Sequence, residues 1–155
     1  MLNQPFYAGG LRFSCMQCSS CCRHESGFVF LSEKDVSVLL AHTRMDYADF
    51  VREYCRWVGE DGEERLSLME KPNFDCIFWD RNCTVYQYRP LQCRTFPFWQ
   101  SMVVSPGAWA AAARDCPGIN RGAVHSREEI ESCLAGREDE TIITRTITGE
   151  KRYVH

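Results

Sequence analysis

The stretch Phe13-Ser14-Cys15-Met16-Gln17-Cys18-Ser19-Ser20-Cys21-Cys22 decides how this chain is organised. It places four cysteines within eight residues and ends with two side by side. Thiols two residues apart on a tight loop can point at one centre, which is the spacing that metal and cluster sites use. Neighbouring side chains diverge along the backbone, so we expect that Cys21 and Cys22 do not serve one mononuclear ion together. The pair indicates two nearby centres, one polynuclear centre, or one ligand beside a spare thiol.

The length and charge of the chain restrict its class. A chain of 155 residues fits one domain, which we place at residues 1–136, with residues 137–155 as a peripheral tail. A net charge of -3 does not favour a nucleic-acid partner. No stretch approaches the roughly 18 apolar residues of a spanning helix, and the first residues do not resemble an export signal. We therefore expect a cytoplasmic protein without a membrane partner.

This expected compartment determines how ten cysteines are interpreted. Reducing cytosol keeps ordinary cysteine pairs open, so metal binding or redox chemistry is the usual reason for a cluster of thiols. The alternative is a disulfide-stapled exported domain, which would need an export signal.

Local patterns predict a mixture of helices and strands. A β-branched and aromatic run at 27–31 predicts a strand, and Ser32 with Asp35 predicts a capped helix start. Apolar residues from Tyr47 to Val58 repeat at helical spacing after Asp46. A charged turn at 59–64 then leads to short strands at 65–68 and 76–79.

The second half of the chain carries weaker signals. Ser105-Pro106-Gly107 favours a hairpin between 102–104 and 108–113, although the alanines there favour helix. Ser126 begins a last helix, and 141–148 could add an edge strand. The fold expected is a small cysteine-rich α+β domain with short antiparallel strands, three or four short helices, and loops organised around metal centres.

Helical periodicity removes two of the ten thiols from the candidate ligands. Cys55 and Cys133 lie on the apolar sides of predicted helices, where a free cysteine packs as a small hydrophobe. The candidate metal ligands are the other eight, all on predicted loops or strand ends: Cys15, Cys18, Cys21, Cys22, Cys76, Cys83, Cys93 and Cys116. Four thiolates complete either a zinc tetrahedron or one cubane cluster, and eight is twice four.

The spacing favours an iron–sulfur cluster over zinc. A zinc site could use Cys15 and Cys18 with a distant pair. A cluster more often uses three thiols spaced two apart and a remote fourth followed by proline, a pattern that Cys15, Cys18, Cys21 and Cys116-Pro117 satisfy. Cys22 would then face the group formed by Cys76, Cys83 and Cys93.

Such centres carry a net negative charge that neighbouring groups must offset. Arg23, Arg89 and Arg94 lie beside cluster cysteines in the sequence and are candidates for this role, or are ordinary surface arginines. His24 is a weaker candidate ligand than the thiols.

These motifs resemble a known family of small cysteine-cluster proteins, the CxxCxxCC family, which is described as zinc- or iron-chelating. The resemblance rests on the opening cluster, on Cys76-Ile77-Phe78-Trp79, on Arg89-Pro90-Leu91-Gln92-Cys93-Arg94-Thr95-Phe96-Pro97 following Cys83, and on Cys116-Pro117-Gly118. It covers roughly residues 10–120. The resemblance implies that the eight cysteines are metal or cluster ligands and that Arg89, Pro90 and Arg94 are motif residues without an assigned role. Members of this family are often labelled iron–sulfur proteins, and a similar module occurs in flagellin lysine methylases. The resemblance implies no particular reaction for this chain.

The sequence thus predicts a protein holding an iron–sulfur cluster of the 4Fe–4S type, with room for a second metal, in electron transfer or a cluster-dependent modification. The alternative is a non-enzymatic zinc module that binds a protein partner. A thiol redox enzyme is a third interpretation and needs an accessible thiol of lowered pKa. No catalytic residue, substrate or specific protein partner can be assigned.

Overall fold

The structure is a computed structural model that describes residues 3–23 and 26–147. Its described strands form three small antiparallel sheets: β1 (Leu11–Phe13) with β6 (Ile119–His125), β2 (Cys55–Glu60) with β3 (Glu63–Leu68) and β7 (Thr144–Thr146), and β4 (Trp79–Asp80) with β5 (Asn82–Cys83). Six α-helices lie in the same described residues: α1 (Glu33–Thr43), α2 (Tyr47–Tyr54), α3 (Leu91–Thr95), α4 (Gln100–Val103), α5 (Pro106–Asp115) and α6 (Arg127–Asp139). Short 3-10 turns occur at η1 (Ser20–Cys22) and η2 (Tyr86–Tyr88). The α+β class is confirmed, with more helices than the three or four expected.

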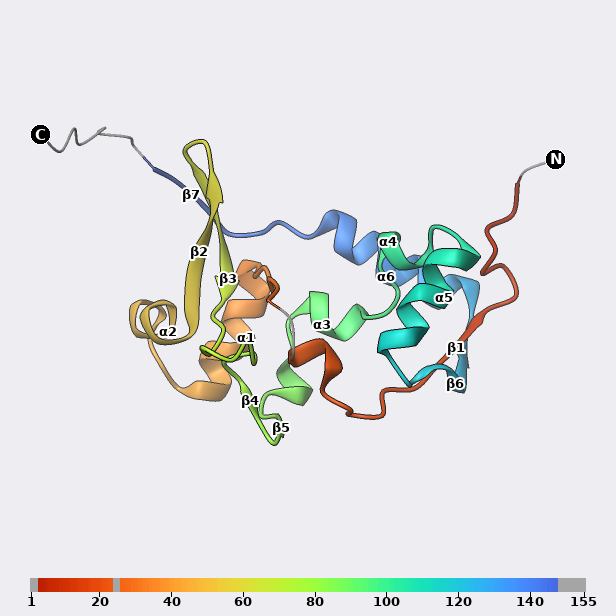
Figure 1. Ribbon diagram of the computed structural model, residues 1–155. Helices are drawn as coiled ribbons and strands as arrows, with labels where there is room; N and C mark the ends of the chain where they lie inside the picture. The colour runs from red at the N-terminus through yellow and green to blue at the C-terminus, as the bar shows by residue number, and fades with distance from the viewer. Residues whose placement is uncertain (1–2, 24–25, 148–155) are drawn as a thin grey trace, which may run out of the picture.

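One half of the molecule packs α1 and α2 against the sheet of β2, β3 and β7 (Figure 1). The predicted start of α1 is confirmed, because Ser32 and Asp35 form a reciprocal capping box. The predicted strand at 27–31 is reduced to a single bridge between Phe30 and Ser67, although this segment also bonds to β3 through the Leu31 N–H and the Leu66 carbonyl at 3.0 Å.

The second helix is shorter than its apolar pattern predicts. α2 begins at Tyr47, capped by Asp46, but ends at Tyr54. The chain then becomes extended at Cys55 and continues as β2, which pairs residue by residue with β3. Pairing with β3 overrides the helical pattern, because Trp57 and Cys55 reach the same core from alternate strand positions.

The other half packs α5, α6 and the β1–β6 pair around a second group of buried side chains. The hairpin predicted around Ser105-Pro106-Gly107 is wrong. The Ser105 hydroxyl accepts the Ala108 N–H at 3.1 Å and Pro106 occupies the first turn, so this stretch starts α5. Serine and proline suit a helix start as well as a turn, and the alanines that follow favour helix.

The last helix starts at the predicted capping box on Ser126 and runs to Asp139, beyond residue 136. β7 then pairs with β3 as an edge strand inside the predicted 141–148 range, of which residue 148 lies outside the described residues.

α3 lies between the two halves, and the cysteine segments gather beside it (Figure 1). Within the described residues, no helix is both long and apolar enough to cross a lipid bilayer. The molecule thus consists of two small cores with the thiols at their junction.

Candidate metal centre

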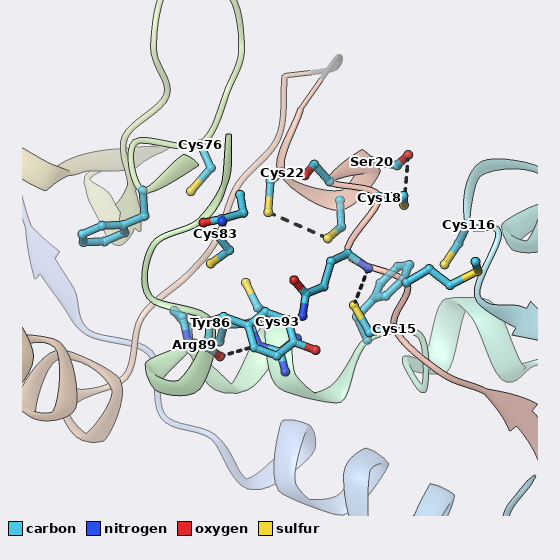
Figure 2. A pocket seen from close by; sticks show the side chains of 18 of the residues that line it. Cys15, Cys18, Ser20, Cys22, Cys76, Cys83, Tyr86, Arg89, Cys93 and Cys116 are labelled. Atoms are coloured by element: carbon cyan, nitrogen blue, oxygen red, sulfur yellow. Dashed lines mark hydrogen bonds between the residues drawn. The ribbon is translucent and has the colours of Figure 1, made fainter. Parts of the chain in front are cut away.

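All eight candidate thiols line one cavity of about 200 Å³ at the junction of the two halves (Figure 2). They come from the loop and turn at 15–22, the loop before β4, β5, α3 and the end of α5. A water molecule occupies about 30 Å³ in the liquid, so the cavity has room for several atoms. Segments that are distant in the sequence therefore come together around the cavity that the thiols line.

Backbone contacts hold the opening loop against the segment that carries Cys116. The Ser14 N–H donates to the Gly118 carbonyl at 3.2 Å. Any side chain at Gly118 would collide with the Ser14 carbonyl, so glycine permits this close approach. The Cys-Pro-Gly motif thus places the remote thiol beside the opening cluster, as the spacing predicts.

A second set of contacts joins the opening cluster to Cys76. The Cys76 N–H donates to the Cys22 carbonyl at 2.7 Å. Next to it, Arg23 Nε donates to the buried Asp75 carboxylate at 2.9 Å, and the Arg23 guanidinium lies 3.8 Å from the centre of the Trp79 ring. This ion pair holds the pKa of Asp75 below its usual range. Arg23 therefore fastens the two cysteine segments together from outside the cavity.

Cys93 is positioned by the packing of α3 on the first half. The Leu91 N–H at the start of α3 donates to Asp35 at 3.0 Å. The Gln92 side chain holds the backbone of 28–30 from both sides, accepting the Phe30 N–H at 3.1 Å and donating to the Phe28 carbonyl at 2.7 Å. α3 thus presents Cys93 to the cavity from a fixed position.

The thiols fall into two groups that Figure 2 shows on opposite sides of the cavity. Cys76 and Cys83 interact electrostatically with each other and with both Cys22 and Cys93, and Cys21 interacts with Cys22, Cys76 and Cys93 as well. Cys116 interacts electrostatically with Cys18 and Cys21, and the Tyr86 side chain lies close enough to Cys15 for the two to interact. The division of the thiols between two centres stays a prediction, because Cys21 interacts with members of both groups.

The adjacent cysteines do not diverge as expected. The sulfurs of Cys21 and Cys22 lie 3.8 Å apart, because the η1 turn advances each residue by about a third of a circle rather than half. Four sulfurs at about 2.3 Å from zinc in a tetrahedron would also lie about 3.8 Å apart. The pair can therefore serve one centre, which corrects the sequence-based expectation. Cys21 also interacts with Cys83 and Cys116, so it lies between the groups.

The contacts among the thiols change their acidity. The side-chain interaction with Cys22 lowers the pKa of Cys21 to about 7 and of Cys83 to about 6, and the same interactions raise the pKa of Cys22. Burial raises the pKa values of Cys76, Cys93 and Cys116. Cys21 is exposed and of lowered pKa, so it has the two properties that thiol redox chemistry requires.

Of the three arginines proposed from the sequence, only Arg89 lines the cavity. Arg94 donates from Nε to the Arg89 carbonyl at 2.9 Å and borders a different groove. Tyr86, which the sequence analysis did not single out, lines the cavity beside Arg89. Its position three residues after Cys83 and three before Arg89 was the available signal. His24 lies outside the described residues.

Both thiols assigned to the cores lie away from the cavity. Cys55 is buried in the first core, and Cys133 packs against the second. Cys55 is the first residue of β2 rather than a helical residue, so its predicted burial is confirmed while the predicted element is wrong.

A comparison with known protein families supplies the deciding observation. The CxxCxxCC family, described as a putative zinc- or iron-chelating domain, matches residues 14–117, which span more than half of the chain. The chain belongs to this family. The match contains all eight cavity thiols, and it supports cysteine-ligated binding of zinc or iron. No solved structure matches the chain.

The donor set fits a metal that prefers sulfur. Eight thiols and the carboxylate of Asp115 line the cavity. No histidine is among the lining residues in the described part of the chain. In the described ranges, no three potential ligand side chains already converge as they would around one ion. Binding would therefore require the exposed side chains of the opening loop to close in. The assignment of individual ligands stays a prediction.

Proposed function

We propose that the protein binds an iron–sulfur cluster through Cys15, Cys18, Cys21 and Cys116, and a second thiolate-bound metal through Cys22, Cys76, Cys83 and Cys93. The observation that carries the proposal is the convergence of all eight thiols on one cavity whose walls are otherwise largely apolar. Two sets of four match the needs of two centres. Cys21 and Cys22, whose sulfurs lie 3.8 Å apart, could exchange places between the two sets of four.

A bound cluster would supply one-electron transfer, and the protein would supply its surroundings. Phe78, Phe96 and Val85 line the cavity with apolar surface and limit the access of water. Cys15, Cys18 and Cys21 are exposed, so this side of the centre faces solvent. A protein partner that exchanges electrons, or a substrate, would approach the opening loop.

Anaerobic purification followed by elemental and sulfide analysis tests the proposal. We expect a brown protein with iron and acid-labile sulfide in equal amounts, and Cys116→Ser should lose most of both. Cys133→Ser is the matched control, because Cys133 packs in the second core. A colourless protein containing zinc and no sulfide would contradict the iron–sulfur proposal.

That same zinc result would support a second candidate, a non-enzymatic zinc module. The observation that favours it is the position of the thiols between two separate cores, with Cys76 and Cys83 packed against the first and Cys116 against the second. A metal there would staple two cores that are individually small. The exposed opening loop would then serve as the surface for a protein partner.

A further inference from the structure

We propose that Arg89 is the residue that offsets the negative charge of the thiolate centre and so sets how tightly the centre holds its metal. This inference rests on the proposed thiolate ligation and assigns a role to a residue for which none is known. Among the described residues that line the cavity, Arg89 is the only lysine or arginine and Asp115 is the only acid.

The charge of the centre explains why a cation is needed there. Four thiolates around Zn²⁺, or around an oxidised cubane, leave a net charge near minus two. Such a charge in a partly buried, apolar site is unfavourable unless a fixed cation or donor offsets it. Arg89 lies within electrostatic range of Cys21 in one group and of Cys83 and Cys93 in the other. One guanidinium can thus act on both groups.

The side chain of Arg89 is held in place rather than free. Its Nε donates to the Tyr86 carbonyl at 2.8 Å, and its guanidinium lies 3.9 Å from the centre of the Tyr86 ring. The Tyr86 side chain also lies within interaction range of Cys15, and both residues line the cavity. The carbonyl of Arg89 accepts a hydrogen bond from Arg94, which fixes the backbone. Figure 2 shows Arg89 and Tyr86 together beside the thiols.

These contacts suit arginine better than lysine. A planar guanidinium can stack on a ring and donate from Nε while its other N–H groups remain available to sulfur. An ammonium has no such planar face and is more strongly hydrated. Tyr86 acts as the positioning residue for Arg89 through both its ring and its carbonyl.

Titration with Co²⁺ tests the inference, because thiolate coordination gives cobalt strong charge-transfer absorption. Apparent affinities are measured by competition with a chelator on anaerobic, reduced protein. We expect Arg89→Gln to weaken Co²⁺ binding roughly 10- to 100-fold, the usual effect of removing a group that supports metal ligands. Arg89→Lys should weaken it less. In protein reconstituted with a cluster, Arg89→Gln should also lower the reduction potential.

Arg81→Gln is the matched control. It removes the same charge two residues before Cys83, but the Arg81 side chain is 92% exposed, so its affinity should equal that of the wild type. Equal affinities for Arg89→Gln and the wild type would overturn the inference. If the glutamine variant does not fold, the Co²⁺ affinity is measured on Arg89→Met instead. That substitution removes the charge but keeps an apolar side chain packed over Tyr86. Absence of thiolate–cobalt absorption in the wild type would instead contradict the proposed function.

Discussion

Cys55 shows that a cysteine in this chain can have a role unrelated to metal. Its side chain is 5% exposed, and it packs in the first core beside Phe50 and Leu66. Burial raises its pKa to about 12, so it stays protonated and unreactive at neutral pH. A metal ligand must instead lose its proton when the metal binds, because the thiolate is the form that binds.

Substitution of Cys55 should separate stability from metal content. We expect Cys55→Ala to lower the free energy of unfolding by about 1 kcal/mol, because it leaves a small cavity. Cys55→Ser should cost about 2 kcal/mol, since it buries a hydroxyl without an assured partner. Metal content per folded chain should stay that of the wild type in both. Urea unfolding and elemental analysis measure these quantities, with Cys83→Ala as the variant that should lose metal. A loss of metal in Cys55→Ala would show that Cys55 contributes to the centre.

At this scale the sequence separated cavity thiols from core thiols, but it did not predict their mutual geometry. Residue type and spacing were enough for the first task, although Cys93 lies within α3 and Cys21 and Cys22 within η1 rather than on loops or strand ends. The contact between Cys21 and Cys22 depends on the 3-10 turn, which has no strong sequence signature here. The position of Tyr86 likewise depends on η2 and became visible only in the fold.

At the scale of elements, two buried carboxyl groups lie near each other where the end of α6 meets the start of α1. Asp35 caps α1 and also accepts the first N–H of α3, and it is buried. The Glu140 side chain is 4% exposed and pairs with Arg137 at 2.9 Å. Burial and the contact with Asp35 raise the pKa of Glu140 to about 7. Lys34, Glu33, Arg94 and Asp139 line the same groove.

This contact should make stability depend on pH in a defined direction. The usual pKa of the Glu140 carboxyl is 4.5, so between pH 4.5 and about 7 the folded protein holds a proton that the unfolded chain has released. Stability contributed by Glu140 is therefore present at low pH and is lost as pH rises through this window. Above it, the ionised Glu140 carboxylate should cost roughly 3 kcal/mol.

Glu140→Gln should remove the loss of stability that occurs as the pH rises. We expect the variant to unfold at higher urea concentration than the wild type at about pH 8, and to differ little from it at about pH 5. Glu138→Gln, on the exposed side of α6, controls for the change of net charge. If the wild type and Glu140→Gln lost stability equally as the pH rose, the Glu140 carboxyl would not be the responsible group.

Helix starts were the most predictable elements, because Ser32 and Ser126 use capping side chains that are visible in the sequence. Ser105 uses the same device, but the proline and glycine after it suggested a turn. β6 was not predicted, because it lacks a regular apolar alternation and contains Asn120 and Gly122 with positive φ. The end of α2 depends on the pairing of β2 with β3, which is a non-local interaction.

At the scale of the whole molecule, the two cores are separate groups of buried side chains. The first consists of Leu31, Val36, Leu39, Phe50, Cys55, Leu66, Leu68, Phe78 and Val85, and the second of Phe98, Val103, Trp109, Ile119 and Ile130. The thiols lie between them, so a bound metal would connect one core to the other. Cooperativity of unfolding should therefore depend on the metal.

Removal of the metal should uncouple the two cores. We expect metal-loaded protein to unfold in one transition, and the chelated, reduced protein to unfold at lower urea concentration in two steps. Hydrogen exchange followed by mass spectrometry should then show different protection for β2–β3 and for α5–α6. A chelated protein that unfolds in a single transition at the unchanged midpoint would contradict this prediction.

The dependence of the opening loop on Gly118 also has a consequence for biosynthesis. Cys15, Cys18 and Cys21 leave the ribosome before Cys116 and before the Gly118 carbonyl that holds Ser14, from which they are separated by a long stretch of chain. Domains fold as units once their residues have emerged. During translation the early thiols would remain open to oxidation and to the wrong metal ions. We therefore expect loading of the centre to be a post-translational step that depends on protected delivery of the metal.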